Sequence, residues 1–173
     1  MTPPQLKNTY TSREVAAMTG LTARQLQWWD QHRLFASHIA PKRTARGGYT
    51  ERRYTPVDLL ELLVLAGLRR QGLSVPQLRR LLDTLRQRFH VRLFETIGGG
   101  GPLTLLTDGR DVYGRTGNGD LFNLLRDPLQ PLLMIADVPG LRELSARAAR
   151  PRKKKPRRPR QIARSDRRAG VSR

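Results

Sequence analysis

Two short helices with clear start and stop signals, separated by a tight turn, constrain the fold of this chain most. Thr11-x-x-Glu14 fits a capping box, in which a hydroxyl and a carboxylate satisfy the free N–H groups at a helix start. Gly20 is placed to end that helix in a left-handed turn, and Thr22-x-x-Gln25 then starts the next helix with a second capping box. Two capped helices joined by such a turn are typical of a helix-turn-helix.

The second helix, expected over residues 23–32, divides into two faces. Leu26 and Trp29 share one side, which suits a core, with Arg33 at its edge. The other side carries long hydrogen-bond donors and an aromatic ring, as a recognition helix does where it meets bases and phosphates: Arg24, Gln27, Trp28 and Gln31. On this segment alone, an ordinary amphipathic surface helix with Trp28 partly buried is an equally good interpretation.

A basic segment with a double glycine follows the second helix. Gly47-Gly48 predicts the turn of a β-hairpin. The hairpin carries five basic residues, Lys42, Arg43, Arg46, Arg52 and Arg53. Such cations neutralise phosphates beside a DNA groove and make affinity depend on salt. A solvated hairpin without a partner is the alternative, but its place directly after a recognition helix favours a DNA-binding wing.

Two further helices complete this part of the chain. Thr55-Pro56-x-Asp58 opens a leucine-rich helix that is apolar on more than one face, so we expect it to be buried between neighbours. Ser74-x-x-Gln77 caps a fourth helix whose single apolar stripe suits an intramolecular core better than a seam for a partner. That helix stops near residue 90, and the glycines at 98–101 predict a flexible linker over residues 91–102.

The order of these motifs resembles the MerR family of bacterial transcription regulators over about residues 10–86. The resemblance rests on Leu26-Gln27-Trp28-Trp29-Asp30, the Gly-Gly-Tyr and Arg-Tyr of the hairpin, Thr-Pro-x-Asp, and Gly-Leu-Ser-x-x-Gln-Leu. The family has Arg-Tyr-Tyr-Glu where this chain has Gln27-Trp28-Trp29-Asp30, so one arginine is lost. The resemblance implies a winged helix-turn-helix domain with four helices at residues 10–90. Two prolines and no periodicity predict a disordered lead-in at residues 1–9.

The pattern and the resemblance together predict the residues at DNA. Arg24, Trp28, Arg46, Tyr49, Arg53 and Tyr54 would lie at or near it by resemblance, although Tyr54 and Trp29 could instead pack the wing on the second helix. The complete predicted set is Ser12, Thr22, Arg24, Gln27, Trp28, Lys42, Arg43, Arg46, Tyr49, Arg53 and Tyr54.

Residues 103–149 read as a small α+β unit of order ββαβα. The pattern predicts strands at residues 103–107 and 111–115 around the Asp108-Gly109 turn, a helix at 121–125, a strand at 132–136 and a helix at 141–149. The unit resembles the short C-terminal domain of certain MerR-like regulators of actinobacteria, which are thought to dimerise through it. The fold class expected is therefore mainly α with small β content, assembled as a homodimer through residues 103–149.

The charge is distributed unevenly along the chain. Of the net +19, residues 1–88 carry +9, residues 89–146 carry −2 and residues 147–173 carry +12. Two basic segments favour double-stranded DNA as the partner. The family resemblance implies RNA polymerase at the promoter as a further candidate. Prolines and like charges predict a disordered basic tail over residues 150–173. An architectural, nucleoid-type DNA binder dominated by that tail is the alternative function.

Other classes of function find little support in the sequence. Cysteine is absent, the three histidines lack metal-ligand spacing, and the glycine run lacks the Lys-Ser/Thr of a phosphate loop. Asp108 and Asp111 are explained by turn chemistry rather than by a carboxylate pair. We therefore expect no enzyme activity, cofactor or metal. No apolar run approaches the length of a membrane helix, and a bacterial cytoplasmic, nucleoid-associated protein is expected.

Overall fold

The computed structural model describes residues 7–43, 50–98, 100–132 and 141–144. Most of the expected lead-in, the Gly47-Gly48 turn and the basic tail lie outside the described residues. The elements are, in chain order, β1 (Tyr10–Thr11), α1 (Ser12–Thr19), α2 (Ala23–Gln31), β2 (Lys42–Arg43), β3 (Thr50–Glu51), β4 (Arg53–Tyr54), α3 (Pro56–Arg70), α4 (Val75–Arg88), the 3₁₀ helix η1 (Leu93–Thr96), β5 (Leu103–Thr107), β6 (Val112–Thr116), β7 (Leu121–Asn123), β8 (Asp127–Leu132) and β9 (Arg142–Glu143).

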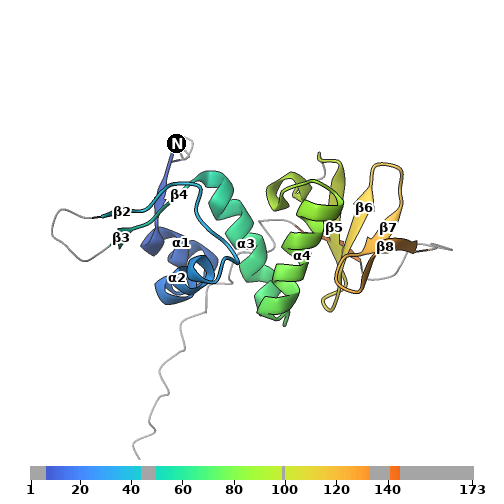
Figure 1. Ribbon diagram of the computed structural model, residues 1–173, viewed down its shortest axis with the longest axis horizontal. Helices are drawn as coiled ribbons and strands as arrows, with labels where there is room; N and C mark the ends of the chain where they lie inside the picture. Colours follow the sequence, from blue (N-terminus) through green and yellow to red (C-terminus); the bar gives the residue numbers. More distant parts are fainter. Residues whose placement is uncertain (1–6, 44–49, 99, 133–140, 145–173) are drawn as a thin grey trace, which may run out of the picture.

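The molecule is elongated, and helices α3 and α4 lie between its two ends (Figure 1). Helices α1 and α2 lie at one end with the antiparallel pair β2–β3, while β1 pairs with β4 beside them. A sheet of five antiparallel strands, in the order β8-β7-β6-β5-β9, forms the other end. The two ends are therefore connected by the packed helices α3 and α4 rather than by an extended linker.

The helix starts follow the capping pattern in the sequence. Thr11 and Thr22 cap α1 and α2 in capping boxes closed by Glu14 and Gln25, and Gly20 between them has a left-handed φ of 76°. The helices α3 and α4 start in the same way, with Thr55 and Ser74 as N-caps. The helix-turn-helix prediction is confirmed, and its boundaries are set by side chains close in sequence.

One hydrophobic core runs through the described part of the chain. Leu62, Leu65 and Leu68 of α3 are completely buried at its centre, as expected for a helix that is apolar on more than one face. The core includes side chains from α1 and α2 on one side, and from α4 and strands β5 and β6 on the other. The leucine stripe of α4 is buried in this core, so its intramolecular interpretation is confirmed.

The segment after α4 packs against α3. The helix ends at Arg88, as expected, and Val91 and Leu93 join the core. The Phe94 N–H donates to Glu61 of α3 over 3.1 Å. A Cβ at Gly101 would lie 1.8 Å from the carbonyl oxygen of Glu95, so the backbone passes too close there for any side chain. At least part of the expected linker is therefore tightly packed.

Strands β5 and β6 lie where the sequence predicts them. They form a hairpin whose turn contains Gly109 at a φ of 92°, a conformation that glycine adopts easily. Asp108 accepts hydrogen bonds from the N–H groups of Arg110 and Asp111, each over 2.8 Å. The Asp-Gly signal in the sequence was therefore sufficient to locate this hairpin.

The order ββαβα is wrong after the second strand. The leucine-rich residues 121–125 form strand β7 and a turn instead of a helix, because Asn123 accepts hydrogen bonds from the N–H groups of Leu125 and Arg126. A tight turn at residues 116–120 also leads directly back from β6 into β7. A short apolar run fits a strand or a helix equally well, and these neighbouring turns decide for the strand.

The last two expected elements also change. The strand expected at residues 132–136 has only Leu132 among the described residues, where it ends β8, a strand that begins at Asp127. At the start of the helix expected over residues 141–149, Arg142 and Glu143 instead form β9 and pair with Thr107 and Leu106 of β5. Pairing with the edge of β5 satisfies backbone groups that a helix would have satisfied internally.

Candidate DNA-reading surface

Helix α2 has one buried and one exposed face. Leu26 and Trp29 are only 3% and 4% exposed, whereas Trp28 is 40% exposed. The other side chains expected at DNA on this helix, Arg24 and Gln27, are also exposed, as is Gln31. Because the buried face fixes the helix on the core, the exposed face is held rigidly as a surface that can enter a groove.

The C-terminal end of α2 is joined to α4. The rings of Trp28 and His32 are stacked, with centroids 4.0 Å apart and an interplanar angle of 20°. The guanidinium of Arg79 on α4 donates to the carbonyl oxygen of His32 over 2.7 Å. Arg33, which the sequence placed at the edge of the core, follows the end of the helix and is exposed at a φ of 52°.

Ser12, Thr22 and Tyr54 have structural partners. Thr22 is exposed at the start of α2, and its hydroxyl accepts from the Gln25 N–H over 3.1 Å. Tyr54 is 3% exposed and belongs to the core, which matches the packing interpretation of this residue. Burial raises the pKa of Tyr54, and a hydrogen bond with Ser12 opposes that shift.

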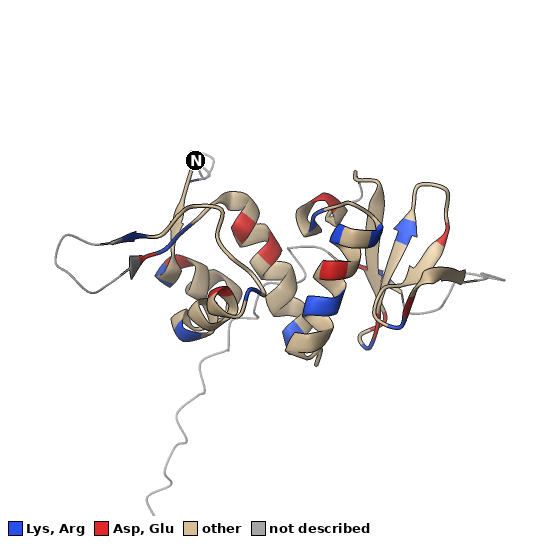
Figure 2. Cartoon of the chain, viewed as in Figure 1, with Lys and Arg blue, Asp and Glu red and all other residues tan. Residues whose placement is uncertain are grey.

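The expected hairpin has paired strands at its base. Lys42 lies opposite Glu51 and Arg43 opposite Thr50, while Arg46 and Tyr49 lie outside the described residues. The Lys42 side chain is exposed, and Arg53 on β4 forms an ion pair of 2.7 Å with Glu51. Figure 2 shows basic positions on β2, α1 and α4, whereas acidic positions are prominent on α3.

An ion pair that the sequence did not reveal fixes β4 beside α2. Arg52 Nε lies 2.8 Å from Asp30 Oδ2, and both side chains are partly buried. Arg52, which is one of the five basic residues of the hairpin, therefore has an internal partner. Asp30 stands next to Trp29 at the end of the aromatic motif, and that position was the only signal that could have indicated its role.

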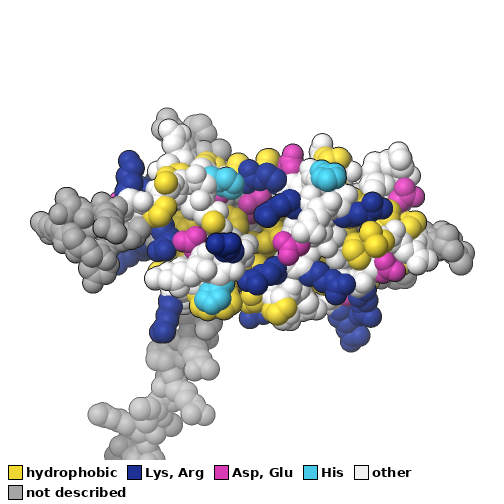
Figure 3. All heavy atoms as spheres, viewed as in Figure 1, with side chains coloured by type: hydrophobic (Ala, Val, Ile, Leu, Met, Phe, Trp, Pro, Cys, Tyr) yellow, Lys and Arg dark blue, Asp and Glu magenta, His cyan; other side chains and the backbone are white. Residues whose placement is uncertain are grey.

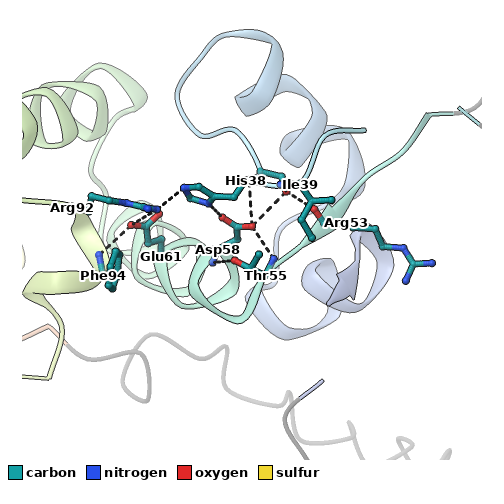
Figure 4. A network of polar contacts seen from close by, with 9 residues as sticks. His38, Ile39, Arg53, Thr55, Asp58, Glu61, Arg92 and Phe94 are labelled. Carbon is teal, nitrogen blue, oxygen red and sulfur yellow. Dashed lines mark hydrogen bonds and ion pairs between the residues drawn. The ribbon is translucent and has the colours of Figure 1, made fainter. Parts of the chain in front are cut away.

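A polar network centred on the buried Asp58 holds the backbone of β4 (Figure 4). Asp58 of α3 is completely buried and accepts from the Thr55 N–H over 2.8 Å. Its carboxylate also binds the His38 ring, and Ser37 beside it donates to the carbonyl oxygen of Arg53. The backbone position of Arg53 therefore depends on a carboxylate in the middle of the protein.

The same network reaches the segment after α4 (Figure 4). Arg92 Nη2 lies 2.6 Å from His38 Nε2 and 3.8 Å from Glu61 Oε1. Since arginine only donates, His38 Nε2 accepts and its Nδ1 carries the proton toward Asp58. Burial is the main cause that raises the pKa of Glu61, whereas the Phe94 N–H and Arg92 lower it.

Comparison with known proteins identifies the family of the helix-turn-helix domain. Residues 10–85 match the family model described as "MerR HTH family regulatory protein". These residues are therefore a MerR-family helix-turn-helix domain. Proteins described as uncharacterized HTH-type transcriptional regulators of Mycobacterium bovis and Mycobacterium tuberculosis are 31% identical to it over 136 residues. The match covers 79% of this chain and 56% of each relative, so the chain spans about half the length of these curated relatives.

Outside its MerR-family domain, the acidic residues of the β5–β6 turn have structural roles. Asp111 pairs with Arg126, with its Oδ2 2.9 Å from Nη2. Asp108 accepts from the Tyr113 hydroxyl over 3.1 Å, and burial together with Asp108 raises the pKa of Tyr113 to about 12.

Among the described residues, no group of three or more His, Asp or Glu side chains could hold a metal. No described helix is long and apolar enough to cross a membrane.

Proposed function

We propose that this protein is a sequence-specific transcriptional regulator that binds a two-fold-symmetric promoter site as a dimer. The observation that carries the proposal is the exposed face of α2 in a MerR-family domain, held by a buried opposite face and flanked by the β2–β3 pair. Two such helices would enter successive major grooves of one operator. RNA polymerase at the promoter is the further partner, and the bacterial cytoplasm with its nucleoid is the proposed location.

The predicted contacts divide into base-reading and phosphate-binding groups. Arg24, Gln27 and Trp28 would face base edges from α2, while Ser12 and Thr22 lie near the helix starts, where phosphates bind. The basic residues of the hairpin, Lys42, Arg43, Arg46 and Arg53, would contact the flanking backbone together with Tyr49. The buried ring of Tyr54 would act by packing beneath them.

Replacement of Arg24 by alanine tests specific reading. A side chain that reads bases adds affinity only at the cognate site, so Arg24→Ala should weaken binding there by about 1–3 kcal/mol and change binding to random DNA much less. The operator is first located by footprinting on the DNA that flanks the gene, and affinities are then measured by fluorescence anisotropy. Arg110→Ala, on the exposed β5–β6 turn, is the matched control. Equal losses on both DNAs would refute specific reading by Arg24.

The dimer is proposed to form through the C-terminal sheet. Leu129 and Leu132 of the edge strand β8 are 69% and 41% exposed, which is unusual for large apolar side chains. Pro128 and Pro131 lack N–H groups and interrupt strand addition, so side-chain packing against a second copy is favoured. A two-fold site requires two copies of α2, which makes a second copy of this chain the proposed partner.

Two neighbouring substitutions on β8 test this surface. Leu129→Lys should shift the protein to monomer, whereas Gln130→Lys, at the next exposed position, should leave the dimer intact. Sedimentation equilibrium measures both states directly. A wild-type monomer, or a Leu129→Lys dimer of unchanged stability, would show that the copies do not meet here.

The basic C-terminal segment favours a second function. Residues 147–173 contribute +12 of the net charge of +19, which is enough to bind DNA without reading its sequence. In this alternative, the protein is an architectural DNA binder and the MerR-family domain only adds to a contact dominated by the segment.

A further inference from the structure

A cavity lies between the exposed end of α2 and helix α4. Its volume is about 600 Å³, and residues from both helices line it, including Trp28 and His32 from α2 and Val75, Arg79, Arg80 and Thr84 from α4. Cavities of about 300–1,000 Å³ are typical of small-molecule sites in proteins. It shares no residue with the polar network of Figure 4.

Two stacked aromatic rings line one side of the cavity. Trp28 and His32 stack with an interplanar angle of 20°, and Trp28 remains 40% exposed. The His32 ring is fixed by its own contact with the Trp28 carbonyl oxygen, at 2.9 Å from Nδ1. Val75 and Pro76 add apolar surface from the start of α4. A planar ligand ring can therefore extend this stack, because its two rings already lie nearly parallel.

The charged side chains of the cavity select for an anion. Arg79 and Arg80 contribute two cations, and neither forms an ion pair with a carboxylate among the described residues. Asp83 is the only acidic side chain among the lining residues. Arg79 is held in place by the His32 carbonyl oxygen, so its guanidinium is oriented before a ligand arrives. Figure 3 shows Lys and Arg side chains gathered over α4 on this face.

We propose that this cavity binds a planar aromatic anion, such as an aromatic carboxylate or a nucleotide, and that the bound ligand opposes DNA binding. The ring would stack on Trp28, and the acidic group would lie between Arg79 and Arg80. The effect on DNA rests on the proposed function, since Trp28 is one of the residues expected to face the bases. A ligand and DNA cannot cover the same face of Trp28 together.

Binding is tested first in the absence of DNA, by calorimetric titration of the full chain. The probes are 2-naphthoate, its neutral analogue 2-naphthylmethanol, and AMP as the nucleotide. We expect 2-naphthoate or AMP to saturate the protein, and 2-naphthylmethanol to bind more weakly than 2-naphthoate. Trp28→Ala should weaken binding about tenfold, and Arg79→Gln or Arg80→Gln about two- to fivefold. Arg110→Gln, remote from the cavity, should have no effect, and circular dichroism confirms that each variant is folded.

The results separate the ligand from the other occupant of a basic surface, the DNA backbone. If neither anion saturates, or if Trp28→Ala binds as well as the wild type, the proposal is wrong. If neither anion saturates and Arg79→Gln weakens binding to random DNA, the cavity belongs to the DNA backbone instead.

Competition with DNA tests the second half of the proposal. The anion that binds should lower the affinity for the operator in the wild type, and less so in Arg80→Gln at the same ionic strength. Unchanged operator affinity at saturating ligand would overturn the proposed antagonism. A protein that binds the anion but no DNA at all would refute the proposed function, while the titration without DNA would still establish the site.

Discussion

Asp58 and Glu61 are buried less than one turn apart on α3, and their partners determine what each contributes. Asp58 is surrounded by donors from Thr55, Ser37 and His38 and holds β4 in place. Glu61 has the Phe94 N–H over 3.1 Å and, more distantly, Arg92. The carboxylate of Glu61 thus loses more hydration than its partners replace, as the raised pKa indicates.

Replacement of Glu61 by glutamine should change how stability depends on pH. Because the pKa of Glu61 is raised in the folded protein, the folded state binds this proton more tightly than the unfolded state. Its contribution to stability is fully present below the unfolded pKa of 4.5 and is lost as pH rises through the folded pKa. Glutamine keeps the acceptor for Phe94 and removes this loss.

Urea unfolding of the wild type and Glu61→Gln between pH 4 and pH 8 measures the effect. The free energy of unfolding of Glu61→Gln relative to the wild type should rise with pH, by about 1.4 kcal/mol for each unit of pKa shift, and level off above the folded pKa. A difference that stays constant over this range would mean that the carboxylate is not destabilised by burial.

The neighbours Trp28 and Trp29 show what a sequence can predict about single residues. Helical periodicity alone assigned Trp29 to the core and Trp28 to the surface, and their exposed fractions of 4% and 40% agree. The ion pair of Asp30 with Arg52 and the contacts of His38 with Asp58 and Arg92 were not predictable. Their partners lie 20 or more residues away in sequence, and no local pattern connects them.

At the scale of elements, local signals predicted the four helices and the first hairpin of the sheet. Capping side chains and the Asp-Gly turn act within a few residues, so they can be read from the sequence. Strand β7 was missed because a short apolar run fits a helix as well, and the turns on both sides of it decide for the strand. Strand β9 was missed because its partner, β5, lies far earlier in the sequence.

The glycine run after η1 contains two adjacent positions with different requirements. A Cβ at Gly101 would meet the backbone of Glu95 at 1.8 Å, whereas a Cβ at Gly100 has no heavy atom within 4 Å. Gly101→Ala should therefore lower the free energy of unfolding by more than about 1 kcal/mol. Gly100→Ala should leave it unchanged or raise it slightly, because alanine restricts the unfolded chain.

Thermal and urea unfolding of these two variants shows whether the run is only a flexible linker or a packed connection. Equal effects of the two alanines would mean that the close approach at Gly101 does not exist in solution. The result bears on how the C-terminal sheet is attached to the helices, because η1 and Gly101 lie where the chain passes from α4 to β5.

At the scale of the whole molecule, the exposed face of α2 and the exposed leucines of β8 lie on opposite sides of a shared core. The core connects α1 and α2 through α3 to α4, β5 and β6. The exposed face of α2 and the proposed dimer surface are therefore parts of one packed body. A dimer through β8 would thus fix the distance between two copies of α2, which sets the spacing of half-sites.

Deletion of residues 147–173 decides whether α2 or the basic C-terminal segment dominates DNA binding. The deletion removes 13 of the 33 basic residues and only one acidic residue. Each phosphate contact that is lost should make the slope of log affinity against log salt shallower by about 0.9. If α2 reads the operator, the truncated protein should bind all DNA more weakly, with a shallower salt dependence, and keep its preference for the operator over random DNA. Anisotropy titrations at several salt concentrations measure both quantities. Loss of that preference together with affinity would instead favour the architectural function, because base contacts by α2 do not depend on a charged segment elsewhere.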